Sequence, residues 1–68
     1  MSVSRISEIK STSTKSFDDA IKQGVARASK TLRNVKSAWV VNQDVRVGDN
    51  GEITEYRVQL KVTFILEN

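Results

Sequence analysis

The clearest pattern in the chain is a regular alternation of apolar and polar residues in its last third. From residue 56 onward every second side chain is apolar, and an alternation of this kind predicts a strand with one face buried. The apolar face comprises Tyr56, Val58, Leu60, Val62, Phe64 and Leu66. The opposite face comprises Arg57, Gln59, Lys61, Thr63 and Ile65. The pattern places this strand at residues 53–66.

A helical period occupies the first half of the chain. Ser16 is a suitable N-cap, Asp19 three residues later fits a capping box, and Asn34 is the predicted end of the helix. Apolar residues at spacings of three and four form one stripe, which comprises Phe17, Ile21, Val25, Ala28 and Leu32. Gly24 lies beside this stripe, although a glycine inside a helix costs up to ~1 kcal/mol relative to alanine. Either it marks a close approach of the helix to a sheet or a neighbouring subunit, or it is a tolerated surface glycine.

Two further strands complete the predicted fold. Val and Ile residues predict a short strand at residues 2–10, followed by a solvated loop at Ser11–Thr14, and a Val-rich segment predicts a strand at residues 35–47. The sequence Gly48-Asp49-Asn50-Gly51 predicts a hairpin turn before the last strand. The expected fold is therefore a single α+β domain over residues 1–68, with the order β-α-β-β and a three-stranded antiparallel sheet wrapped on one helix.

One helix can cover only one face of this sheet. The helix-facing layer should include Ala38 and Val40, which leaves Ser37, Trp39, Val41 and Gln43 on the opposite face. An aromatic side chain can bury 150–250 Å², so an uncovered Trp39 would forgo several kcal/mol at ~25 cal/mol/Å². We interpret this face as a subunit interface, or as a ligand pocket at such an interface. The alternative is a single surface tryptophan that needs no explanation.

Length and composition favour self-association. A chain of 68 residues has a marginal core, and without Cys or His it has neither disulfides nor ligands for zinc or copper. Partner subunits are the remaining means of stabilisation. The net charge of +3 comes from basic residues spread along the chain, which does not favour nucleic-acid binding. No apolar run approaches the ~20 residues of a membrane span, and the N-terminus lacks a signal-peptide pattern, so we expect a cytoplasmic protein.

The residue types also argue against catalysis. The usual general bases and thiol nucleophiles are missing because the chain has no His and no Cys. Asp44, Asp49 and Glu52 offer oxygen ligands for a hard cation but do not follow the EF-hand spacing. We interpret them as solubilising residues at the hairpin end, and we expect no enzymatic activity.

The whole chain resembles the dodecins, which are β-α-β-β proteins of similar length. The matching segments are Ser16-Phe17-Asp18-Asp19-Ala20, Ala26-Arg27-Ala28-Ser29-Lys30-Thr31-Leu32-Arg33-Asn34 and Glu55-Tyr56-Arg57-Val58-Gln59-Leu60-Lys61-Val62-Thr63-Phe64. The resemblance implies a hollow homo-oligomeric shell of twelve subunits that stores a small ligand. Typical dodecins bind flavin (FMN or riboflavin) between Trp side chains at subunit interfaces, and a Gln on the last strand hydrogen-bonds the flavin edge.

This sequence departs from the family pattern at both of those positions. Ser37 stands where the stacking Trp is expected, and Arg57 stands where the Gln is expected. Trp39 lies two residues further on, on the same face and roughly 6–7 Å along the strand. The candidate ligand-binding residues are therefore Ser37, Trp39 and Arg57. The alternative is a flavin-free dodecin that acts as a structural shell or binds a divalent cation, Ca²⁺ or Mg²⁺.

Overall fold

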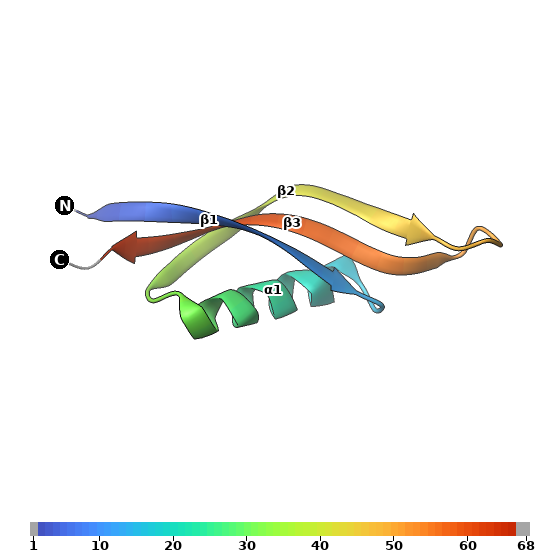
Figure 1. Cartoon of the computed structure of the whole chain (residues 1–68), viewed down its shortest axis with the longest axis horizontal. Helices are drawn as coiled ribbons and strands as arrows, with labels where there is room; N and C mark the ends of the chain where they lie inside the picture. The colour runs from blue at the N-terminus through green and yellow to red at the C-terminus, as the bar shows by residue number, and fades with distance from the viewer. Residues whose placement is uncertain (1, 67–68) are drawn as a thin grey trace.

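The structure, a computed structural model, describes residues 2–66 and contains three strands and one helix in that range. They follow in the order β1 (Val3–Ser13), α1 (Phe17–Thr31), β2 (Val35–Val47) and β3 (Ile53–Leu66). The sheet order is β1-β3-β2, and β3 pairs antiparallel with both neighbours (Figure 1). The predicted α+β fold and β-α-β-β order are confirmed, and the predicted bounds of the second and third strands are those observed.

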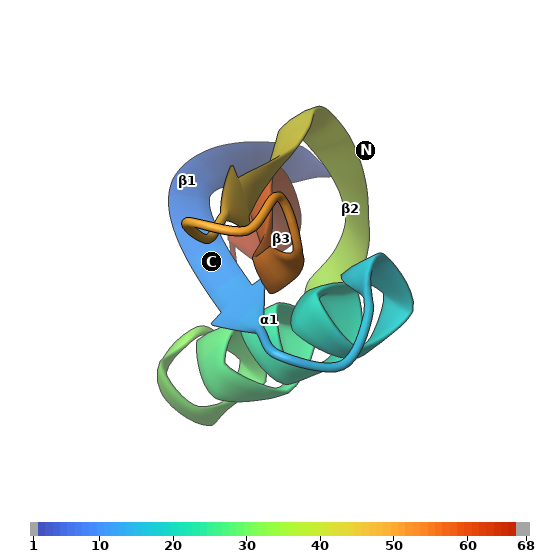
Figure 2. The same ribbon diagram turned by 90° about the vertical axis from the view of Figure 1, so that its right-hand side faces the viewer.

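The helix covers one side of a long, curved sheet. Viewed along the long axis, the three strands curve over one side of α1 (Figure 2). The molecule measures 53 × 19 × 14 Å, and the hairpin between β2 and β3 extends well beyond the N-terminal end of α1 (Figure 1). In residues 2–66 no second helix faces the other side of the sheet. The same part of the chain contains no helix with the length and hydropathy that a membrane crossing requires.

The buried core lies between α1 and β3. It comprises Ala20, Ala28, Val58, Leu60 and Val62, which confirms the predicted apolar face of the last strand. Ala38 packs against this core, whereas Val40 is 39% exposed. Val40 pairs with the buried Leu60, which confirms its predicted place on the helix-facing side of the sheet, but it stays partly exposed because α1 lies mainly against β1 and β3 and reaches β2 only marginally.

The first strand is longer than the sequence predicts. Ser11 and Ser13 pair with Val58 and Tyr56 of β3, so the prediction of a solvated loop is wrong for residues 11–13. The strand continues because β3 supplies hydrogen-bonding partners along its whole length. Ser13 is buried, its hydroxyl donates to Asp19 Oδ2 at 2.6 Å, and it accepts a hydrogen bond from the Lys15 amide at 2.9 Å.

The ends of α1 follow from their capping residues. The Ser16 side chain accepts a hydrogen bond from the Asp19 amide at 3.0 Å, which confirms the predicted N-cap. The helix ends at Thr31, and the Leu32 N–H bonds to the Ala28 carbonyl at 2.9 Å. The prediction that the helix ends at Asn34 is wrong. Asn34 lies in the connection to β2 and has a left-handed φ of 60°. Asparagine tolerates this conformation better than most residues.

Candidate functional site

The candidate site lies on the sheet face opposite α1, which we call the open face. Strand register identifies its members, since residues directly opposite one another point to the same side of a sheet. Ser37 pairs with Thr63 and Trp39 pairs with Lys61, so both predicted residues share a face with Arg57. The assignment of Ser37, Trp39 and Arg57 to one face is thus confirmed.

A β-bulge at Val41 changes the register of β2 beyond this point. Val40 pairs with Leu60, whereas the next residue paired with β3 is Asn42, opposite Gln59. The extra residue shifts the alternation by one position, which exchanges the two faces for residues 42–46, up to a second irregularity between Arg46 and Val47. Gln43 therefore pairs with Val58 on the helix side, and its prediction as an open-face residue is wrong.

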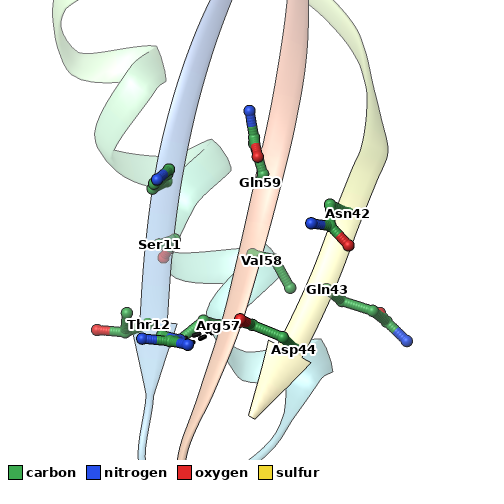
Figure 3. A pocket seen from close by; sticks show the side chains of 9 residues that line it. Ser11, Thr12, Asn42, Gln43, Asp44, Arg57, Val58 and Gln59 are labelled. Atoms are coloured by element: carbon green, nitrogen blue, oxygen red, sulfur yellow. Dashed lines mark hydrogen bonds and ion pairs between the residues drawn. The ribbon is translucent and has the colours of Figure 1, made fainter. Parts of the chain in front are cut away.

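The same bulge brings Asp44 onto the open face beside Arg57. The Arg57 Nε donates to Asp44 Oδ1 at 2.9 Å, and Nη2 donates to Oδ2 at 2.7 Å (Figure 3). The hydrogen bond from Arg57 lowers the pKa of the Asp44 carboxyl, and the positive charges of Arg57 and Lys10 act in the same direction. The pair thus holds the guanidinium in a fixed orientation across the sheet, and Nη1 takes no part in the bond to Asp44.

A polar pocket of about 220 Å³ surrounds this ion pair (Figure 3). All three strands contribute to it, with Lys10 and Thr12 from β1, Asn42 and Asp44 from β2, and Arg57 from β3. The next side chain along β3 on this face is Gln59, whose Nε2 donates to the Glu8 carboxylate. The pocket lining therefore combines two cationic side chains, three amides and two hydroxyls with one carboxylate.

Trp39 lies outside this pocket. Its side chain is 47% exposed, and the Lys61 Nζ sits 5.9 Å from the ring centroid, which is a cation–π distance. Its partner Lys61 is four residues from Arg57 on β3, a separation of roughly 13 Å at strand spacing. Ser37 lies further still from Arg57, because its partner Thr63 follows Lys61 by two residues on β3. One chain therefore presents Ser37, Trp39 and Arg57 on one face but does not bring them together around a single ligand.

The pocket residues other than Arg57 are not evident from the sequence. Asp44 is grouped there with Asp49 and Glu52 at the hairpin end, whereas the structure separates it from them through its bond to Arg57. Within residues 2–66 no group of three or more Asp, Glu, His or Cys side chains is placed to hold a metal ion. The alternation of apolar and polar residues along β2 was the signal that could have identified the pocket residues. The bulge at Val41 inverts which face this alternation assigns to Asn42 and the residues that follow it in the pocket.

Comparison with known proteins assigns the family. A family model described as Dodecin matches residues 3–67. The chain belongs to the dodecin family. A dodecin from Streptomyces davaonensis is 36% identical and superposes with a TM-score of 0.91, over 98% of this chain and 97% of that one.

A second relative is a calcium dodecin from Mycobacterium tuberculosis. It is 38% identical over 64 residues, which cover 94% of this chain and 89% of that protein. A crystal structure of calcium dodecin from that organism, described as having a novel calcium-binding site, superposes with a TM-score of 0.82 at 32% identity. That superposition covers 96% of this chain and 91% of the other. Dodecins are small binding proteins that form homo-oligomeric shells. The relatives of this dodecin include one described simply as a dodecin and one described as a calcium dodecin.

Proposed function

We propose that this dodecin is a non-catalytic shell subunit that binds a small ligand between the open faces of neighbouring copies. The observation that carries the proposal is that Trp39 is half-exposed on a sheet face that no helix in residues 2–66 covers. A second copy facing it would bury the indole ring, whose burial is favourable by ~25 cal/mol/Å². The assembly would be the twelve-subunit shell implied by the family, and the predicted cytoplasmic location remains a prediction.

A site shared between copies also accounts for the separation of the three candidate residues. Trp39 and Arg57 are roughly 13 Å apart along one sheet, which exceeds the reach of one flat ring system edge to edge. When two open faces meet, Trp39 of one copy and the Arg57 pocket of the other can approach the same ligand. Ser37, with its short side chain, leaves space beside Trp39 for that ligand.

The ligand that these residues favour is a flavin, FMN or riboflavin. An exposed indole face suits stacking on a flat aromatic ring. Arg57 supplies donors only, so it suits the carbonyl oxygens of the ring or the phosphate of FMN. The adjacent Asp44 carboxylate supplies the acceptor that an N–H on the ring edge requires.

A divalent cation is the second candidate, and the calcium dodecin relative is the observation that favours it. Ca²⁺ takes six to eight oxygen ligands and Mg²⁺ takes six. Because no acidic cluster exists within residues 2–66 of one copy, the carboxylates would have to come from several copies. A symmetry axis of the shell is where identical side chains from several copies meet.

Two titrations distinguish these candidates. Flavin binding should quench the fluorescence of FMN or riboflavin at micromolar protein, and Trp39→Ala should abolish the quenching while Trp39→Phe retains part of it. Unquenched fluorescence with the unmodified protein would exclude the flavin. Calorimetry with Ca²⁺ and Mg²⁺, together with melting curves with and without a chelator, tests the cation. The absence of both binding heat and any change in melting temperature would exclude the cation.

A further inference from the structure

The structure leaves two complementary features without a partner, and they lie apart from each other in the molecule. One is an apolar groove between α1 and β1, and the other is the tip of the β2–β3 hairpin. We propose that the hairpin tip of one copy binds in the α1–β1 groove of the next copy. This contact differs from the open-face ligand site, with which its groove shares Lys10.

The lining of the groove combines apolar side chains with basic and uncharged polar ones. It has a volume of about 620 Å³, and its apolar lining includes Ile9, Ala28 and Leu32. Lys10 and Arg27 are its basic residues, on the strand and on the helix, respectively. The groove runs beside β1, which is an edge strand whose outer side pairs with no strand of the described chain. A partner that carries apolar side chains and carboxylates would match both parts of the groove.

The tip of the β2–β3 hairpin carries both apolar side chains and carboxylates. Val47 and Ile53 pair across the two strands and are 56% and 50% exposed. Three carboxylates accompany them, those of Asp49, Glu52 and Glu55, whereas Arg46 is the one basic residue between positions 46 and 55. The turn is well defined, since the Gly48 N–H bonds to the Glu52 carbonyl at 2.8 Å and the Asn50 N–H bonds to the Glu52 side chain at 3.1 Å. The tip is thus an ordered acidic projection with an apolar pair.

Another exposed apolar group lies at the opposite end of the sheet, at Val3, Ile6 and Leu66. It fits the groove less well, because Arg5 lies between Val3 and Ile6 and the groove lining already carries basic side chains. Opposite charges across an interface favour association, whereas like charges oppose it. The charges therefore select the hairpin tip as the occupant.

The tip and the groove of one chain do not meet. The groove involves Leu32 and the second half of α1 from Gln23 onward, whereas the tip projects past the first residues of α1 (Figure 1). The contact must therefore join different copies head to tail. A head-to-tail contact that closes on itself gives a ring, which is compatible with the closed shells of the dodecin family.

Charge reversal provides a direct test, read by sedimentation velocity of the full chain across a range of concentrations. Arg27→Glu and Asp49→Lys should each weaken assembly at least about tenfold, because each places like charges at the contact. The double variant carrying both changes should recover much of the lost assembly, since it restores an opposite-charge pair. Lys22→Glu, on the same helix but outside the groove, is the matched control and should assemble normally. Circular dichroism checks that each variant retains its secondary structure.

A second pair of variants tests the apolar part of the contact. Ile53→Ser at the tip should weaken assembly, whereas Val3→Ser at the other end should not. If Val3→Ser weakens assembly and Ile53→Ser does not, the other end of the sheet occupies the groove and the proposal is wrong. The proposal is also wrong if Arg27→Glu assembles like the unmodified protein, or if the double variant is no better than the single ones. These outcomes are independent of the flavin and cation titrations.

Discussion

Gly24 in α1 lies so close to Leu60 of β3 that a Cβ atom on Gly24 would stand 3.1 Å from the Leu60 Cδ1 atom. The same Cβ would stand 3.1 Å from Ser11 Cβ in β1. Leu60 is only 1% exposed, so its methyl groups have little room to move away. Of the alternatives considered for Gly24, the structure supports a close approach of the helix to the sheet of its own chain.

Replacement of Gly24 by valine should destabilise the fold. The branched side chain would be forced against Ser11 and Leu60, and overpacking of a well-packed core costs about 1–3 kcal/mol. Ala26→Val, at an exposed position of the same helix, is the control and should cost only about 0.5 kcal/mol through helix propensity. Urea denaturation followed by circular dichroism gives both values. Equal midpoints for the two variants would contradict the tight contact.

Replacement of Trp39 by alanine should weaken assembly as well as thermal stability. If a neighbouring copy covers the exposed indole ring, its truncation should cost at least about 2 kcal/mol of association free energy, as for other buried interface aromatics. Sedimentation velocity and thermal melting measure the two effects. Trp39→Phe retains an aromatic ring and should show a smaller loss. A protein that sediments as one chain before mutation would rule out the open-face interface.

The Ser13 hydroxyl should control the titration of Asp19. Its hydrogen bond is the largest cause of the lowered pKa of Asp19, followed by an opposing effect of burial and then the bond from Gln23. Because the folded pKa is below the unfolded one, this contribution to stability is present above the ordinary value of 3.8 and is lost as the pH falls through the folded pKa. Ser13→Ala should raise the pKa of Asp19 and also leave the Lys15 amide without its acceptor, at a cost of about 1 kcal/mol. NMR titration of the Asp19 carboxyl in both proteins checks this, with Ser11→Ala as a control.

Arg57→Gln should raise the pKa of Asp44, as Ser13→Ala should raise that of Asp19. The hydrogen bond from Arg57 is the largest cause of the lowered pKa of Asp44, so that pKa should rise toward 3.8 in the variant. The unmodified protein should then hold an advantage in stability above pH 3.8 that disappears as the pH falls through the lowered pKa. Urea denaturation of both proteins at neutral and at acidic pH measures this difference. Arg46→Gln, which removes a charge further along β2, should leave the pKa of Asp44 nearly unchanged.

The sequence predicts those elements whose signals are local. The alternation of β3 is long enough to set both its bounds and its buried face, and Ser16 marks the start of α1 through its own hydrogen bond. The end of β1 depends instead on pairing with a strand more than forty residues away in the chain. A run of Ser and Thr is typical of a loop, so its membership of the strand is visible only once β3 is in place.

The candidate site illustrates the same limit. Ser37 and Trp39 precede the bulge, and a period of two places them correctly. No residue type at Val41 indicates that the chain gains an extra residue there, so the period predicts the wrong face for Gln43 and conceals the partner of Arg57. The interaction that organises the pocket therefore depends on a backbone irregularity that the sequence does not announce.

The position of β3 in the sheet has a consequence for how the chain is made. β1 and β2 each hydrogen-bond to β3 and not to each other, and β3 is the last of these elements to leave the ribosome. Before it emerges, only α1 can gain structure locally, and an isolated helix of 15 residues is marginal in water. The sheet therefore forms after translation of residues 53–66 rather than progressively. In the interval, two strands rich in Val and Ile remain unpaired and open to association with other nascent chains.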